Sequence, residues 1–351
     1  MALADRGKHF GQIDALRSFA VLMVVLTHWL PNTKLGEFES GIYGVDMFFT
    51  ISGFLITYLF FIDKERHSDG KGAVLGNFYM RRVLRIFPIY YLLLFVFILL
   101  NKTLHVWIWN EGNGIYYLTY ASNILFFLKG DQSTELQHTW SLCVEEQFYI
   151  FWPLCLLFLS QRQTLYFLIA VFVTGIVSNF LWMGIKIRLF PIGNFHTLGI
   201  GALLAYLVLY HKQDDFYRTT LKKYCLPAFF ASFALLCIFL FYHFSTTLMI
   251  PFLLSLSSGL ILFIAYNGET TLLNPVLNSK QLQYLGKLSY GIYLYHKPIP
   301  SFLKIIFLKL HVALPAPPIY FLLCVAVIIP IVITSYYLIE KPILKLKTKF
   351  I

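Results

Sequence analysis

Long apolar runs separated by short, mostly basic links dominate the chain. Stretches such as Phe229–Tyr242 and Phe321–Ile333 contain no charged residue. A helix of about 20 apolar residues is long enough to cross the hydrocarbon core of a bilayer. The pattern therefore predicts an all-α integral membrane protein, a single bundle of about ten transmembrane helices with no separate soluble domain. The predicted spans are 13–30, 44–62, 87–100, 141–160, 164–183, 194–210, 225–242, 248–266, 286–308 and 318–340.

An eleventh apolar run, Ile115–Leu128, is short and interrupted by polar residues. The run either crosses the membrane or does not, and the distribution of charge along the chain favours the second. If this run does not cross, the basic clusters Lys64–Arg85, Lys212–Lys223 and Lys341–Lys349 all lie in the cytoplasm, as the positive-inside rule requires. If it crosses, the last two clusters move to the outside. We therefore expect ten spans with both termini in the cytoplasm.

Composition narrows the class of protein. Apolar residues make up 58% of the 351 residues, and charged residues only 13%, whereas soluble domains carry about 25% charged residues. These values exclude a soluble globule, a disordered chain and a disulfide scaffold. The formal net charge of +11 fits basic cytoplasmic loops, and no basic face on a folded domain indicates nucleic-acid binding.

Cysteines and the N-terminal segment give two further expectations. The five cysteines stand in or beside apolar runs without CxxC spacing, so we interpret them as small hydrophobic residues rather than metal ligands or disulfide partners. The first apolar run follows Arg6 and Lys8 as a signal peptide would, but it lacks a small-residue cleavage site. We expect it to be retained as the first helix.

The first span carries three ionisable residues on one stripe. From Arg17 to His28 is about 1100° of helical rotation, within about 20° of three full turns, and Asp14 falls about 40° from His28. The imidazole stands about 16 Å further along the helix than the guanidinium. Ionisable residues inside a bilayer cost about 2.5–3.5 kcal/mol each, which makes them functional candidates. The alternative is an interfacial Asp14–Arg17 pair with His28 near the outer headgroups.

The next candidates lie in and after the second span. Ser52 stands in mid-span beside a glycine, where small residues favour close helix packing. Further along, Arg81, Arg82 and Arg85 lie within a turn of one another, so their guanidinium groups converge on one patch. A planar guanidinium suits bidentate contacts to phosphate, which indicates a phosphate clamp. Anchoring to anionic lipid is the alternative.

Two adjacent carboxylates enter a later span, in the segment HTWSLCVEEQFYIFWPL. Glu145 and Glu146 point about 100° apart on a helix, so both face one groove only if that groove is wet or lined by cations. The alternative is that they pair with arginine or lysine and hold helices together.

In LGKLSYGIYLYHKPIP, spacings of 4, 3 and 4 place Ser289, Tyr293, His296 and Pro300 on one face. The His-Lys-Pro sequence indicates a proline kink that opens into a polar cavity. A histidine that only packs is the alternative. We find no metal-ligand spacing, nucleophile elbow, phosphate loop or dinucleotide fingerprint.

Six segments carry, in order, a resemblance to a known family: IDALRSFAVLMVVLTH, GVDMFFTISGFLI, RRVLRIFPIYYL, HTWSLCVEEQFYIFWPL, LGKLSYGIYLYHKPI and YYLIEKPIL. From about residue 10 to residue 345 the chain resembles the acyltransferase-3 family of multi-pass membrane acyltransferases. The resemblance implies a ten-helix bundle in the bacterial cytoplasmic (inner) membrane. It also implies transfer of an acyl group, most often acetyl from cytoplasmic acetyl-CoA, to a hydroxyl of an envelope glycan or related acceptor.

The resemblance also carries over to individual residues. The functional arginine and histidine of the family's first helix match Arg17 and His28, and its RxxR motif matches Arg82 and Arg85, with Arg81 adjacent. Cys143 stands where a serine is common. Some members carry a fused esterase-like domain after an extra helix. Since this chain ends at Ile351, we expect the stand-alone form.

We hypothesise direct acyl transfer within the membrane, without a metal ion. Arg81, Arg82 and Arg85 hold the phosphates of coenzyme A, and His28 is the general base on the acceptor hydroxyl. Arg17, oriented by Asp14, is expected to support the thioester arm or the oxyanion. Glu145 or Glu146 is expected to orient a histidine or to bind the sugar. The residues expected to bind substrate are Ser52, Tyr290, Tyr293 and His296. A covalent acyl-His28 intermediate is a variant of this hypothesis.

Several alternatives stay open from the sequence. The same buried residues suit a transporter or flippase, although we find no inverted repeat and the arginines lie outside the spans. An inactive scaffold protein is a third class. For an enzyme, the acceptor is an LPS O-chain, a capsule, an exopolysaccharide, a lipid-linked sugar or a secreted metabolite. The partners expected are therefore acyl-CoA, this acceptor and the lipid bilayer. The oligomeric state is open, a homo-oligomer included.

Overall fold

The computed structural model of the chain describes residues 10–30, 40–66, 70–104, 112–130, 135–182, 185–242, 249–268 and 272–350. Arg6 and Lys8, and position 248 at the predicted start of one span, lie outside these ranges. The described residues form helices and no strand, which confirms the all-α prediction.

Helices follow one another along the whole described chain. The first half of the chain forms α1 (Gly11–Trp29), α3 (Ser40–Arg66), α4 (Lys71–Leu104), α5 (Gly114–Leu118), α6 (Ser122–Lys129), α7 (Thr139–Phe158) and α8 (Gln161–Leu181). Next come α9 (Ile185–Arg188), η2 (Pro191–Asn194), α10 (Phe195–Tyr210), η3 (Phe216–Leu221), α11 (Lys222–Phe241) and α12 (Met249–Asn267). The last part forms α13 (Asn274–Leu277), α14 (Lys280–Tyr295), α15 (Pro298–Lys309), α16 (Pro317–Ser335), η4 (Tyr336–Glu340), α17 (Lys341–Lys345) and η5 (Leu346–Phe350).

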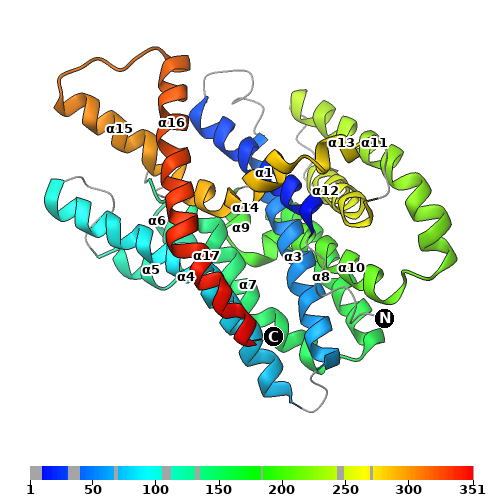
Figure 1. The fold of residues 1–351 in the computed structure, drawn as a ribbon. Helices are drawn as coiled ribbons and strands as arrows, with labels where there is room; N and C mark the ends of the chain where they lie inside the picture. Colours follow the sequence, from blue (N-terminus) through cyan, green and yellow to red (C-terminus); the bar gives the residue numbers. More distant parts are fainter. Residues whose placement is uncertain are drawn as a thin grey trace.

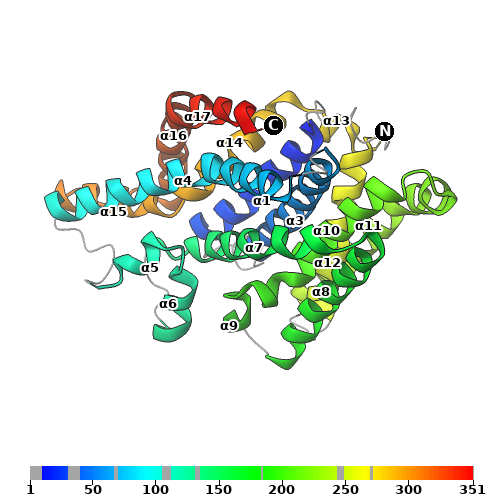
Figure 2. The same ribbon diagram turned by 90° about the horizontal axis from the view of Figure 1, so that it is seen from below.

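Helices α1 and α3 occupy the centre of the bundle. In Figure 1 and in the rotated view of Figure 2 they are surrounded by the other helices, while α11 and α15 lie at opposite edges. Helix α3 packs against α1 and α10, and α1 also packs against α14. The central helices are accordingly the buried ones, with Phe54 and Tyr58 of α3 each 1% exposed. Peripheral helices such as α11 and α16 are buried on one narrow side only.

Eight helices of the described ranges are long and apolar enough to cross a bilayer. The predicted spans 13–30 and 286–308 are not among these eight. The first of them is α1, whose Asp14, Arg17 and His28 lower its hydropathy. The second is divided into α14 and α15. Both α1 and α14 lie against other helices inside the bundle, where polar side chains need not face lipid.

The ambiguous run Ile115–Leu128 forms the two short helices α5 and α6, of 5 and 8 residues. A helix of 8 residues is about 12 Å long, less than half of the hydrocarbon thickness. Neither helix is long enough to cross, as we expected from the charge distribution. Helix α5 contacts α4, whereas α6 packs against α7 (Figure 2).

A proline divides the predicted span 286–308. Helix α14 ends at Tyr295, and α15 begins at Pro298. Proline has no backbone N–H to donate to the preceding turn, but it is well suited to the first position of a new helix. The predicted kink is therefore a break between two helices, and it exposes backbone carbonyls close to His296.

Glycines allow the central helices to approach closely. A Cβ added to Gly53 of α3 would lie 2.1 Å from the Leu198 carbonyl oxygen of α10, and one added to Gly201 of α10 would lie 2.1 Å from the Thr50 oxygen. A Cβ at Gly286 of α14 would lie 1.7 Å from the Asp14 oxygen of α1. Backbones that approach this closely leave room for glycine alone.

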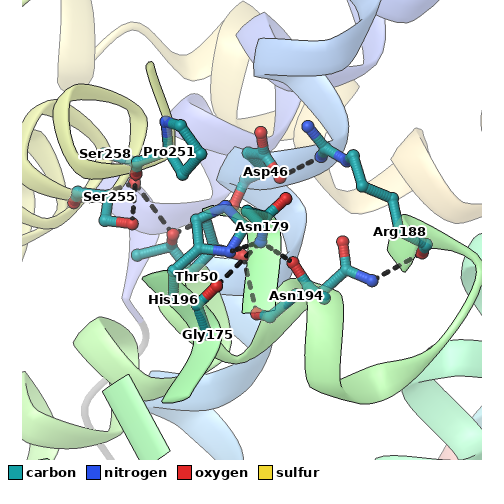
Figure 3. A network of polar contacts seen from close by, with 12 residues as sticks. Asp46, Thr50, Gly175, Asn179, Arg188, Asn194, His196, Pro251, Ser255 and Ser258 are labelled. Atoms are coloured by element: carbon teal, nitrogen blue, oxygen red, sulfur yellow. Dashed lines mark hydrogen bonds and ion pairs between the residues drawn. The ribbon is translucent and has the colours of Figure 1, made fainter. Parts of the chain in front are cut away.

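A buried polar network joins α3 to the short segment α9–η2 (Figure 3). The Arg188 guanidinium contacts Asp46 at 2.5 Å, and the Asp46 side chain is fully buried. The Asn194 amide donates to the Arg188 carbonyl at 2.7 Å, and Asn179 donates to the Gly193 carbonyl at 2.7 Å. In a dry interior, hydrogen bonds and ion pairs of this kind offset much of the cost of burying these polar groups.

The glycine contacts lead to a stability prediction. Replacement of Gly53 or Gly201 by valine forces α3 and α10 apart, and overpacking of this kind typically costs about 1–3 kcal/mol or more. Gly76 of α4 is the control, because nothing lies within 4 Å of a Cβ built there. We expect Gly53→Val and Gly201→Val to lower the thermal midpoint of the detergent-purified protein well below that of Gly76→Val. Equal midpoints for all three variants would contradict the close contact.

Candidate active site

The carboxylate and guanidinium near the start of α1 form an ion pair. Arg17 Nη1 donates to Asp14 Oδ1 at 3.0 Å, an i,i+3 contact. Only 16% of the Arg17 side chain and 11% of the Asp14 side chain are exposed. Arg17 therefore lies inside the bundle, and Asp14 both neutralises and orients it.

Two cavities adjoin at Arg17. The entrance cavity, of about 450 Å³, lies at the end of the bundle where α1 begins, and it is lined there by Phe10, Ile13, Ile62 and Leu344 among others. The central cavity, of about 90 Å³, lies deeper and reaches Ser52, Ser141 and Tyr293. Both cavities are lined by Arg17, Leu55, Arg85 and Tyr290. They therefore form one route from that end of the bundle toward its middle.

The three arginines of α4 have different surroundings. Arg81 forms an ion pair with Asp63, and its Nη1 donates to the Phe350 carbonyl at 2.7 Å. The Arg82 guanidinium lies over the Phe78 and Tyr149 rings, 5.7 and 5.8 Å from their centroids. Arg85 lines both cavities. Arg82 and Arg85, the predicted RxxR pair, thus face the route, while Arg81 is held at its edge by Asp63.

A lysine of the C-terminal turn η5 lies near these arginines. Burial lowers the pKa of Lys347 to about 6, and the charges of Arg85, Arg82, Arg81 and Arg17 act in the same direction. Both effects favour the neutral form of this amine. Arg17 and Arg85 line both cavities, and Lys287 lines the entrance cavity.

The two glutamates of α7 have different environments. Ser52 Oγ donates to Glu145 Oε1 at 2.7 Å, and the Tyr149 hydroxyl donates to Ser52 Oγ at 3.1 Å. Glu145 lines the central cavity, and Glu146 does not. Glu146 is buried with its Oε1 atom unpartnered. Neither forms an ion pair with another described residue, so the alternative of a helix-to-helix salt bridge is not what the structure contains.

Three imidazole rings lie together beyond the central cavity. The ring centroids of His28 and His296 are 5.0 Å apart, and those of His138 and His296 are also 5.0 Å apart. His28 comes from the end of α1, His296 from the end of α14, and His138 from the turn before α7. Among the described residues no set of histidine, cysteine and carboxylate side chains is arranged to hold a metal ion.

Backbone contacts determine the tautomers of two of these histidines. His28 Nδ1 lies 2.8 Å from the Val24 carbonyl oxygen, and His296 Nδ1 lies 2.6 Å from the Tyr293 carbonyl oxygen. A carbonyl oxygen only accepts, so each Nδ1 carries the proton and each neutral ring has its lone pair on Nε2. His28 is exposed at its end of α1, so this lone pair is available to a substrate.

Tyr293 connects the central cavity to the histidines. It lines that cavity, its hydroxyl lies 2.5 Å from Ser141 Oγ, and it donates to the His138 carbonyl at 3.1 Å. Its ring centroid is 5.6 Å from that of His138 and 5.5 Å from that of His296. The Tyr290 hydroxyl, in contrast, donates to the Ile86 carbonyl at 2.8 Å, although Tyr290 still lines both cavities.

The structure therefore brings most of the predicted site residues onto one route. Sequence reasoning missed His138, which is fully buried at the N-cap of α7. The available signal was a histidine directly before the Thr-Trp-Ser segment, at the same end of the bundle as His28. It also missed Glu340, which lines the entrance cavity. The arrangement supplies a cationic entrance, a narrow polar interior and, next to Tyr293, a cluster of histidines.

Comparison with known proteins agrees with this arrangement. The acyltransferase domain family matches residues 10–336. The chain is 30% identical to the “Putative peptidoglycan O-acetyltransferase YrhL” of Bacillus subtilis, over 94% of this chain and 54% of that protein. It is 27% identical to the peptidoglycan O-acetyltransferase OatA of Listeria monocytogenes, over 83% of this chain and 49% of that protein.

The chain spans about half the length of these relatives. No solved structure matches it. The family match covers α1 to α16, which carry the central cavity and the histidine cluster, while Glu340 and Leu344 of the entrance cavity lie just beyond it. The chain is thus a multi-pass membrane protein that belongs to the acyltransferase family.

Proposed function

We propose that the chain is a membrane O-acetyltransferase that uses cytoplasmic acetyl-CoA and acetylates a hydroxyl of an envelope glycan. One observation carries this proposal: two adjoining cavities, both lined by Arg17 and Arg85, run from the start of α1 to Tyr293, whose ring lies 5.5 Å from that of His296 in the histidine cluster. An enzyme that takes its donor from one side of a membrane and its acceptor from the other requires such a route.

The donor enters at the entrance cavity. Coenzyme A carries several phosphate charges, and guanidinium groups bind phosphate through short, charge-assisted hydrogen bonds. Arg82 and Arg85 are the phosphate ligands in this proposal, and Arg81 contributes less because Asp63 already pairs with it. The narrow pantetheine arm then extends through the central cavity and brings the thioester toward Tyr293.

The distance between Arg17 and His28 along α1 supports different tasks for the two residues. They are 11 residues apart on one straight helix, or about 16 Å along its axis. Both cannot contact the same carbonyl group. Arg17, which lines both cavities, supports the donor arm, and the role of oxyanion stabiliser falls to donors nearer His28.

At the far end of the route, His28 is the general base. Its Nε2 accepts the proton of the acceptor hydroxyl while the hydroxyl oxygen attacks the thioester carbonyl carbon. The tetrahedral intermediate collapses, the carbon–sulfur bond breaks, and the imidazolium returns its proton to the departing thiolate. Catalysis of this kind contributes about 10²- to 10⁴-fold.

The names of the relatives favour peptidoglycan as the first acceptor to test. Both of these relatives are named for O-acetylation of peptidoglycan. In this proposal a sugar hydroxyl of this polymer is acetylated on the outer side of the membrane, at the end of α1 that carries His28.

The assignment of His28 as the general base predicts a specific loss of activity. Membranes that contain wild-type protein, labelled acetyl-CoA and native envelope glycan should yield base-labile label in the glycan. We expect His28→Ala to lower this rate about 10²- to 10⁴-fold without lowering the thermal midpoint. His211→Ala is the control, because His211 is paired with Asp214 near the end of α10. An active His28→Ala enzyme would refute the assignment.

The assignment of Arg82 and Arg85 as phosphate ligands predicts a change in the kinetics of the acetyl-CoA donor. Loss of one charge-assisted contact in Arg82→Ala or Arg85→Ala should raise the KM for acetyl-CoA about 10- to 100-fold, since such bonds contribute about 1.5–3 kcal/mol. Acceptor kinetics should stay near wild type. Arg162→Ala is the matched control, because Arg162 contacts Tyr166 within α8. If only the acceptor KM changes, these arginines do not bind the donor.

A further inference from the structure

A buried carboxylate in the entrance cavity has no hydrogen-bond or ion-pair partner among the described residues. Glu340 ends the π-helical turn η4, is 7% exposed and lines this cavity. Its Oε1 atom makes no hydrogen bond, and no described cation lies within 4.0 Å of the carboxylate. A buried ionised group without a hydrogen-bond or ion-pair partner raises the free energy of the folded protein. The carboxylate is therefore suited to a ligand that donates hydrogen bonds.

The same cavity carries positive charge. Arg85 and Lys287 line it together with Arg17. Arg17 is neutralised by Asp14, whereas Arg85 and Lys287 form no ion pair among the described residues. A ligand of this cavity therefore also bears negative charge.

Aromatic rings form much of the cavity wall. Phe10, Tyr58, Tyr290 and Tyr336 all line it, and they come from four different parts of the chain. Phe10 and Tyr58 contact each other edge to face, with ring centroids 5.7 Å apart. Flat aromatic walls favour a planar heterocycle, and stacking of a nucleobase on an aromatic side chain contributes about 1–3 kcal/mol.

The entrance cavity, of about 450 Å³, therefore favours a ligand with three features. These are a planar ring, a hydrogen-bond donor on the edge of that ring, and an attached anion. An adenine nucleotide satisfies all three, because its 6-amino group donates and its phosphates are anionic. An anionic lipid headgroup satisfies the third requirement alone.

We propose that the entrance cavity binds the adenine nucleotide end of the acyl donor and that Glu340 accepts a hydrogen bond from the adenine 6-amino group. This inference rests on the proposed use of acetyl-CoA. It places the base between the aromatic walls and the phosphates toward Lys287, Arg85 and, deeper on the route, Arg82. Glu340 is then a specificity residue for the donor, far from the acetyl group that is transferred.

The test is a double comparison of donors and variants. We would measure kcat/KM for acetyl-CoA and for its analogue in which hydrogen replaces the adenine 6-amino group. The wild-type enzyme should use acetyl-CoA about 10- to 100-fold better, the value expected for one lost bond to a charged group. In Glu340→Ala the two donors should become equal, because the partner of the amino group is gone.

Glu65→Ala is the matched control, since Glu65 is an exposed glutamate near the C-terminal end of α3 and does not line the entrance cavity. It should keep the wild-type preference. Equal use of both donors by the wild type would overturn the adenine pocket and leave the acetyltransferase proposal standing. No turnover of acetyl-CoA by the wild type would overturn both. The wild-type comparison does not depend on the folding of any variant.

Discussion

The rest of the structure depends on the way other helices enclose the ionisable stripe of α1, on which the Asp14 and Arg17 side chains are largely buried. Asp14, Arg17 and His28 cannot face lipid without a large cost in free energy, so other helices must enclose the stripe that carries them. Gly286 lets α14 approach the backbone of α1 at Asp14, and α3 covers a neighbouring face. The result is a central helix with a neutralised arginine at one end and an imidazole at the other.

This enclosure leaves a polar route rather than a solid core. Arg17 belongs to both cavities, and beyond them Tyr293 contacts the segment that carries His138. Glu145 lies on the route with Ser52 as its partner, while Glu146 points elsewhere, as two consecutive helical residues must. The polar side chains therefore divide into those that line the route and those that are buried beside it.

Much of this arrangement follows from local sequence patterns. Helical periodicity predicted the common stripe of Asp14, Arg17 and His28, and proline chemistry predicted the interruption near His296. Contacts between residues far apart in the chain could not be predicted in this way. The pairing of Arg81 with Asp63 and the place of His138 beside His296 depend on how helices pack, as does the position of Glu340 in the entrance cavity.

The prediction of the membrane spans was also limited, because local sequence patterns do not show how helices pack. Hydropathy located the peripheral helices that face lipid, but the two predicted spans with the most polar groups became the buried α1 and the divided pair α14 and α15. Their polarity reflects their position at the route. The residues that weaken the membrane signal are those that form the candidate site.

The central claim is that donor and acceptor meet from opposite sides of the membrane through this route. Sealed inside-out vesicles present the cytoplasmic face to the medium, so labelled acetyl-CoA can be added outside while the glycan acceptor is enclosed in the lumen. The account predicts base-labile label on the enclosed glycan with the vesicles intact. Label that appears only when donor and acceptor share one compartment would contradict it.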